Sequence, residues 1–140
     1  MKMKFILIFA MTFFACSKED NTNSILNGKW KLIKYHNLSS GMSDSEPTNI
    51  LRSIIIDFSD NGTKGIMNGI TVTNSVSGDY ELLKDNKMKT VSFSTTEVVE
   101  PNWGIRFGNA IRSTSSYEVQ TNKLFIYFNA DTEKMEFEKQ

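Results

Sequence analysis

The stretch SIIIDFSDNGTKG, residues 53–65, contains a strand pattern followed by a turn. Apolar side chains recur at every second position, the period of two that is typical of a strand with one buried face: Ile54, Ile56 and Phe58. The dipeptide Asn61-Gly62 then suits a tight hairpin turn, because these residue types tolerate positive φ. The stretch therefore predicts a β-hairpin and hence an antiparallel sheet.

A further strand precedes this hairpin. The segment GKWKLIKYHN, Gly28–Asn37, places Trp30 and Leu32 on one face. The polar segment that follows, 38–49, is expected to be a loop, because Ser, Gly, Pro and Asn recur in it.

More strands are expected after the hairpin. Two lie around 66–73 and 78–83, and the turn KDNK then leads into a strand at 88–95. One face of that strand is expected to be shared by Val91, Phe93 and Thr95. Near the C-terminus we expect strands at 116–120, 123–128 and 134–139, with these side chains inward: Leu124, Ile126, Phe128, Met135 and Phe137.

The period changes in EPNWGIRFGNAIRS, residues 100–113. Apolar residues recur here at a spacing of four, which predicts a helix with one buried face: Trp103, Phe107 and Ile111. Pro101 suits a first helical turn, where no amide proton is needed. Gly104 and Gly108 weaken the helix by up to about 1 kcal/mol each. Packing is therefore expected to hold this helix more than intrinsic propensity does.

These elements predict a fold of the mainly β (α+β) class. We expect an antiparallel, barrel-like domain of about eight short strands over residues 26–140, with one short helix before the last strands. Closing the sheet into a barrel would remove its exposed edges.

The first fifteen residues have the layout of a signal peptide. Lys2 and Lys4 form a positive n-region, an apolar run extends from Phe5 to Phe14, and the small Ala15 follows. About ten apolar residues are too few for a transmembrane helix, which needs about 20. Residues 1–15 are therefore expected to be removed during export.

Cys16 is the one cysteine of the chain and directly follows the apolar run. The motif FFAC resembles a bacterial lipobox, in the looser form of Bacteroidetes lipoproteins, with Phe13 and Phe14 where Leu and a smaller residue are usual. The resemblance implies a lipid-modified Cys16 carrying acyl chains such as palmitate, and two or more chains anchor a protein stably without spanning the membrane. An ordinary cleaved signal with a chance cysteine is the alternative.

Residues 16–25 are expected to form the lipidated cysteine and a disordered linker, because 17–24 contains no apolar side chain. Lys18, Glu19 and Asp20 resemble the export signal of surface lipoproteins in the same bacterial group. That resemblance implies a lipid-anchored protein of the outer membrane, exposed at the cell surface. The alternative is an orientation toward the periplasm.

The charge balance of the sequence limits which classes of partner the protein can bind. The sequence has 16 basic and 16 acidic residues, and loss of Lys2 and Lys4 leaves a mature net charge of −2. Nucleic-acid binding is excluded, because no basic stripe is present to neutralise phosphates. A lipidated Cys16 leaves no disulfide, so stability must come from packing. We expect a monomer without a cofactor.

Few residues are candidates for catalysis, and the protein is expected not to be an enzyme. His36, the one histidine, ends the first strand and is expected to be a surface or capping residue, because acid–base catalysis needs a partner within hydrogen-bond reach. Glu97 and Glu100 lie beside the predicted helix start, where negative charge is favourable without any chemistry.

A metal site is also not expected. The oxygens of Asp57, Ser59 and Asn61 superficially resemble a calcium loop with Gly62 at its sixth position. Asn68 stands where the loop needs a bidentate glutamate, so the hairpin turn is the better interpretation.

The order of these motifs resembles the META-domain family, the small HslJ-like envelope domains. LNGKWKL, residues 26–32, looks like the family's opening strand, and IIIDFSDNGTKG like its strand, turn and glycine. NSVSGDY, residues 74–80, fits its Asn, Gly and Tyr at offsets of four and six, and the segment STTEVVEPNWGIRF and then YEVQTNKLFIYF fit its helix and closing hairpin. The chain departs from the family at Val72-Thr73, where Gly-Cys is typical, and lacks the second cysteine.

This resemblance implies a non-enzymatic envelope lipoprotein with a binding or stress-related domain and an unknown protein or small-molecule partner. GKW, residues 28–30, also resembles the Gly-x-Trp that opens lipocalin barrels, which implies a carrier of a small hydrophobic ligand. In lipocalins, however, the helix follows the eighth strand. A barrel interior filled with side chains would favour the META-like domain, whereas a hollow interior would favour the carrier.

The strand at 123–128 is apolar on both faces, because Phe125 and Tyr127 alternate with the inward residues. Its second face is either a partner surface or covered by the helix or a neighbouring sheet.

Overall fold

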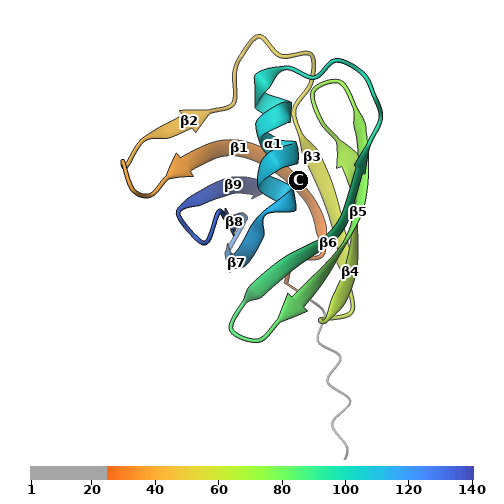
Figure 1. Cartoon of the computed structure of the whole chain (residues 1–140), viewed down its shortest axis with the longest axis vertical. Coiled ribbons are helices and arrows are strands. Elements are labelled where there is room, and N and C mark those ends of the chain that lie inside the picture. The colour runs from red at the N-terminus through yellow and green to blue at the C-terminus, as the bar shows by residue number, and fades with distance from the viewer. Residues whose placement is uncertain (1–24) are drawn as a thin grey trace, which may run out of the picture.

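The computed structural model describes residues 25–140 of the chain (Figure 1). The predicted signal peptide 1–15, the lipid site Cys16 and the export residues Lys18, Glu19 and Asp20 lie outside the described residues. Between residues 25 and 140, no helix is both long and apolar enough to cross a membrane.

The described part of the chain contains nine strands and one helix. Their bounds are β1 Gly28–Asn37, β2 Ser43–Ser45, β3 Ile55–Asp60, β4 Lys64–Ile70, β5 Ser75–Leu83, β6 Lys87–Thr95, α1 Asn102–Arg112, β7 Thr114–Gln120, β8 Lys123–Phe128 and β9 Glu133–Lys139.

Eight of these strands close into an antiparallel barrel. Neighbours pair in the order β1-β3-β4-β5-β6-β7-β8-β9, and β9 returns to pair with β1. β2 is an additional strand that pairs with β1 through Lys34, Tyr35 and His36. The predicted fold class, a mainly β antiparallel barrel with one short helix before the last strands, is confirmed.

One hydrophobic cluster fills the barrel interior. The predicted inward side chains of the first, third, eighth and ninth strands, and of the residue that precedes β3, are all buried: Trp30, Leu32, Ile54, Ile56, Phe58, Leu124, Ile126, Phe128, Met135 and Phe137. The helix adds Trp103, Phe107 and Ile111, as its spacing predicts. Burial of large side chains of this kind contributes roughly 1.5–3 kcal/mol each.

The predicted hairpin after β3 is confirmed. Gly62 has a φ of 91°, so it supplies the left-handed residue of the turn. Asn61 contributes in another way, because its Oδ1 accepts hydrogen bonds from the backbone N–H groups of Thr63 and Lys64 at 3.1 and 2.9 Å.

The prediction that Val91, Phe93 and Thr95 share one face of β6 is wrong for Val91, whereas Phe93 and Thr95 do pair with the alternate β5 residues Gly78 and Val76. A register shift in the pairing with β5 leaves one extra residue on β6, a β-bulge that reverses the alternation. Met88 is buried, whereas Val91 is 55% exposed, Phe93 is half-buried and Thr95 is exposed.

β2 lies inside the segment 38–49 that was predicted to be a loop. Its three residues are all exposed, so no alternation of apolar side chains marks it. Its backbone pairing depends on the length of β1, which continues past the end of its pairing with β3.

The helix closes the weakest part of the barrel. β6 and β7 share one register pair, Lys87 with Ser116, and α1 connects these two strands. The ring of Phe107 packs edge-on against Phe93 at 6.0 Å. Tyr35 and Trp103 pack in the same way at 4.5 Å.

The barrel has two distinct ends (Figure 1). The first described residues and the hairpin loops 61–63 and 84–86 lie at the lower end of the view, and the loops 46–54, 71–74 and 96–101 lie at the upper end with the start of α1. Asn27 exchanges two hydrogen bonds with the backbone of Asp60, at 3.2 and 2.7 Å, so the start of the domain is fixed at the lower end.

Candidate functional site

The upper end of the barrel is organised around the carboxylate of Glu100. Its Oε2 accepts hydrogen bonds from Thr71 Oγ1, Thr73 Oγ1 and Asn74 Nδ2 at 2.6, 3.0 and 2.6 Å. Burial alone would raise the pKa of Glu100, but these hydrogen bonds outweigh it and lower the pKa below its ordinary value. The ionised carboxylate therefore links the loop before α1 to the turn between β4 and β5 by hydrogen bonds.

Asn74 strengthens this link with further hydrogen bonds to the loop before α1. Its Oδ1 accepts hydrogen bonds from Thr96 Oγ1 and the Val98 N–H group, both at 2.8 Å, and its Nδ2 also donates to the Val98 carbonyl. Arg52 donates to the carbonyls of Thr71 and Asn74 at 2.8 and 3.0 Å. Three loops of the upper end are thus joined at Asn74, through its side-chain amide and its backbone carbonyl.

Two pockets flank the helix that starts at this end. A pocket of about 200 Å³ lies between α1 and β6, and one of about 420 Å³ lies between α1 and the end of β8. Ile105 and Asn109 line both pockets, so they form a ridge between them. Ile105 is 48% exposed.

Apolar side chains are exposed on the neighbouring loops. Leu51 is 79% and Val99 is 90% exposed, and Val98 is also exposed. Val98 and Val99 are adjacent to Glu100, and Leu51 precedes Arg52, which bonds the same turn. Exposed apolar groups beside pockets are typical of interaction surfaces.

Arg106 joins the helix to the strands beside it. Its guanidinium donates to Asp44 Oδ2 in β2 at 2.7 Å and to Glu133 Oε2 in β9 at 3.3 Å. The Cζ atom also lies 4.2 Å from the centroid of the Tyr35 ring, a cation–π contact. Burial raises the pKa of Tyr35 well above its ordinary value, although the charge of Arg106 opposes this effect. Arg106 therefore fixes α1 against both β2 and β9.

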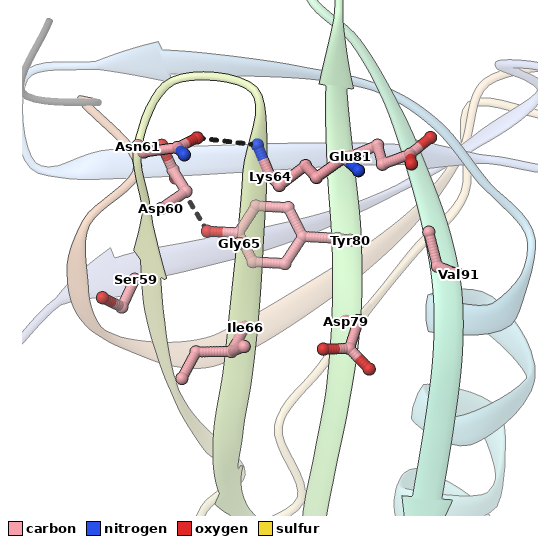
Figure 2. A pocket seen from close by; sticks show the side chains of 10 residues that line it. All are labelled: Ser59, Asp60, Asn61, Lys64, Gly65, Ile66, Asp79, Tyr80, Glu81 and Val91. Carbon is pink, nitrogen blue, oxygen red and sulfur yellow. Dashed lines mark hydrogen bonds between the residues drawn. The ribbon is translucent and has the colours of Figure 1, made fainter.

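A different pocket, of about 410 Å³, opens on the wall formed by β3 to β6 (Figure 2). The Tyr80 ring lies across Gly65, where a Cβ atom would collide with it, and its hydroxyl donates to Asp60 Oδ2 at 2.7 Å. Burial, reinforced by the Asp60 carboxylate, raises the pKa of Tyr80. Gly62 N–H also donates to Asp60 Oδ1 at 2.8 Å, so the Asp60 carboxylate is occupied by structural contacts.

The residues of the superficial calcium loop are not brought together as a ligand set. Asn61 Oδ1 is engaged by its own turn, and Asp57 and Ser59 lie on a strand rather than around a loop. Among residues 25–140, no three His, Cys, Asp or Glu side chains are grouped so that they could hold a metal ion.

The candidate acid–base residues lie apart from one another. His36 Nε2 lies 2.7 Å from Glu136 Oε2 on the side of the barrel. Glu97 is exposed and forms no hydrogen bond with Glu100 within residues 25–140. The carboxylate of Glu100 lies beside the first turn of α1, where its charge was predicted, and it also bonds side chains of the turn between β4 and β5.

The second apolar face of β8 is covered by a lysine rather than by a helix or sheet. Phe125 is 8% exposed, and Lys134 Nζ lies 4.3 Å from its ring centroid and 5.7 Å from that of Tyr127. The alkyl chain of a lysine can cover apolar surface in this way while its charge stays in water.

The sequence did not predict the hydrogen bonds that Glu100 makes with the turn between β4 and β5, nor those that Arg106 makes with β2 and β9. The pattern NSVSGDY did single out Asn74, Gly78 and Tyr80, and each has a structural role. Asn74 joins the upper loops, Tyr80 bonds Asp60, and a Cβ atom at Gly78 would collide with the Ser92 carbonyl.

The fold and the upper-end site define a small closed antiparallel barrel with a helix packed beside its opening. The sequence matches no protein-family model and no curated protein. Two solved structures share the fold. A DUF4847 family protein from Bacteroides vulgatus has a TM-score of 0.62 at 15% identity, covering 82% of this chain and 95% of that one. A protein from Burkholderia xenovorans has a TM-score of 0.61 at 18% identity, covering 82% of this chain and 83% of that one. At such identities the likeness shows the fold alone.

Proposed function

We propose that this protein is a non-enzymatic cell-envelope lipoprotein, anchored through Cys16, whose META-like barrel binds a partner at its upper end. The observation that carries the proposal is the placement of the two ends. The described chain starts at the lower end, and the loops that carry the exposed Leu51, Val98 and Val99 lie at the upper end with the start of α1. The two pockets flank this helix. A lipid anchor below would hold this surface away from the membrane.

The packing of the interior favours this proposal over a lipocalin-like carrier. The largest side chains of the cluster are fully buried, among them Trp30, Tyr35, Phe58 and Phe107. Close-packed interiors have few voids larger than a water molecule. A ligand would therefore bind the outside of the barrel. Mass spectrometry of the protein extracted from its host should find no co-purifying hydrophobic compound.

The anchor is tested by metabolic labelling with a fatty acid. The wild type should incorporate the label, and Cys16→Ala should be unlabelled and released from membranes. Protease treatment of intact cells should degrade the wild type, and alanine at Lys18, Glu19 and Asp20 should protect it. An unlabelled wild-type protein would contradict the lipoprotein proposal.

The binding surface is tested by a photo-crosslinking amino acid introduced in cells. Position 99, in the exposed loop before α1, should give a discrete adduct. Position 83 is the matched control, because Leu83 is also exposed, at 53%, but lies next to the lower hairpin loop 84–86. Equal adducts at both positions, or none at 99, would contradict an upper-end partner.

A further inference from the structure

The lower end of the barrel is unlike the rest of the molecule in its charge. It comprises the hairpin loops 61–63 and 84–86 and the chain segment 25–29. We include the loop 121–122 and the segment 138–140, because the Lys139 N–H group donates to the Asn122 carbonyl and the Gln140 N–H group to the Lys29 carbonyl. Six lysines lie in or directly next to these segments: Lys29, Lys64, Lys84, Lys87, Lys123 and Lys139. The same positions hold three carboxylates, Asp60, Asp85 and Glu138, an excess of three positive charges. The other described residues hold seven basic and eleven acidic side chains.

Half of these lysines are already engaged within the domain. Lys87 pairs with Asp131 at 3.3 Å, and Lys123 pairs with Glu136. Lys139 donates to the Asn27 carbonyl at 2.6 Å and lies over the ring of Trp30.

The other half form no ion pair within residues 25–140, and Lys29, Lys64 and Lys84 are all exposed. Carboxylates do lie near them, because Asp57 and Glu81 are opposite Lys29 and Lys64 in the strand pairing and Asp85 follows Lys84. Asp60 is occupied by Tyr80 and by the Gly62 amide. The three exposed ammonium groups are not held in an internal contact, so they can meet an anionic partner.

The path of the chain indicates what that partner is. Ile25, 64% exposed, begins the described domain at this same end, where Asn27 bonds Asp60. Nine peptide units separate Cys16 from Ile25, and even fully extended they span no more than about 30 Å. A lipid on Cys16 would therefore keep the lower end close to the membrane surface, where electrostatic attraction acts within about 8 Å at physiological salt.

We propose that the lower end is a contact surface for the anionic headgroups of the membrane, with Lys29, Lys64 and Lys84 as its main charges. The inference rests on the proposed lipid anchor. Each lysine near an anionic lipid surface strengthens binding by about five-fold. A single tether allows any orientation, whereas this second contact holds the barrel upright with α1 and its pockets facing outward.

The test uses the mature chain with its natural cysteine coupled to a maleimide headgroup lipid in vesicles. Because Cys16 is the chain's one cysteine, the coupling reproduces the tether whether or not cells acylate it. Vesicles of phosphatidylcholine alone are compared with vesicles that also contain phosphatidylglycerol. The readout is the rate of amine acetylation at each lysine, followed by mass spectrometry.

Acetylation of Lys29, Lys64 and Lys84 should slow by about five-fold on the anionic vesicles and recover at high salt. Lys31, Lys34 and Lys134 on the side of the barrel should react equally on both vesicles. Lys87, at the same end, should also react more slowly on the anionic vesicles, and it should lose this protection in the variant K29Q/K64Q/K84Q. The variant K31Q/K34Q/K134Q removes the same charge and should preserve protection at the lower end.

Equal protection of both lysine sets, or no difference between the two vesicles, would overturn the inference. Neither result depends on acylation in cells. A negative result on the vesicles would therefore say nothing against acylation of Cys16. Conversely, absence of fatty-acid labelling in cells would contradict the lipid anchor but would not change the charge contact measured on the vesicles.

Discussion

Gly104, in the first turn of α1, lies directly against the side chain of Glu100. A Cβ atom at position 104 would collide with the Oε1, Cδ and Cγ atoms of that glutamate. Oε1 is buried and has no hydrogen-bond partner among the described residues, while Oε2 holds the turn between β4 and β5. A glycine that weakens the helix therefore leaves room for the carboxylate that joins the upper loops.

We predict that Gly104→Ala destabilises the domain although alanine is the better helix former. The propensity gain is at most about 1 kcal/mol. Displacing Glu100 loses hydrogen bonds to a charged group that contribute about 1.5–3 kcal/mol each. The expected net loss is about 2 kcal/mol in the free energy of unfolding, measured by urea denaturation.

Gly108→Ala is the matched control, one turn further along the same helix. Its new Cβ would meet the exposed guanidinium of Arg112 at 3.1 Å and Phe93 at an ordinary 4.0 Å, so stability should be unchanged or rise by up to about 1 kcal/mol. In a Glu100→Ala background, Gly104→Ala should also cease to destabilise. A Gly104→Ala protein as stable as wild type would contradict the stabilising role assigned to the Glu100 carboxylate.

The local elements of the fold could be predicted because their signals lie in neighbouring residues. The spacing of Trp103, Phe107 and Ile111 predicts α1, and Asn61-Gly62 predicts the first hairpin. β2 and the bulge at Val91 could not be predicted, because each depends on how far a neighbouring strand extends or shifts. Strand pairing is a property of two segments, and a one-residue shift reverses every side chain.

The candidate site was even less accessible from sequence. Glu100 bonds residues 26 to 29 positions away, and Arg106 bonds partners 62 and 27 positions away. No local pattern marks such contacts. Threonine, asparagine and glutamate in polar loops are expected to be solvated, and only the closure of the barrel brings these three loops together.

We predict that Glu136→Gln lowers stability at neutral pH and flattens its pH dependence. Burial would raise the pKa of Glu136, but hydrogen bonds and positive charge from Lys123 and His36 lower it below 4.5. The folded protein therefore binds this proton less readily than the unfolded chain. The resulting stability is present above about pH 4.5 and is lost as the pH falls below it.

The variant should lose about 1–3 kcal/mol at pH 7. Its unfolding free energy should then fall less steeply than that of wild type between about pH 5 and pH 3. Glu138→Gln is the control, because Glu138 lies on the same strand but is exposed and forms no ion pair in the described structure. Parallel pH profiles for wild type and Glu136→Gln would count against this account.

We predict that Ala130→Gly stabilises the protein. Asn129, Ala130 and Asp131 form the turn between β8 and β9, and all three have positive φ, at 50°, 54° and 62°. An alanine in the left-handed region costs roughly 1–2 kcal/mol, a cost that glycine avoids. Allowing for the greater flexibility of glycine in the unfolded chain, thermal unfolding should show a gain of about 0.5–1 kcal/mol. Ala110→Gly, in the helix, should be destabilising, and a loss at both positions would contradict the argument.

We predict that Arg106→Lys releases β2 while leaving the barrel intact. One planar guanidinium reaches Asp44 and Glu133 and stacks on Tyr35, a geometry that an ammonium group cannot reproduce. Because Arg106 is only partly buried, these contacts together contribute about 1 kcal/mol. The larger effect should be local, since β2 is held otherwise by its pairing with one edge of β1. Hydrogen exchange at the β2 amides should accelerate, with no change at β3 or β4.

Arg112→Lys is the control, because Arg112 stacks on Phe93 and bonds its own helix without touching β2. If β2 exchanges at the same rate in both variants, Arg106 does not hold this strand.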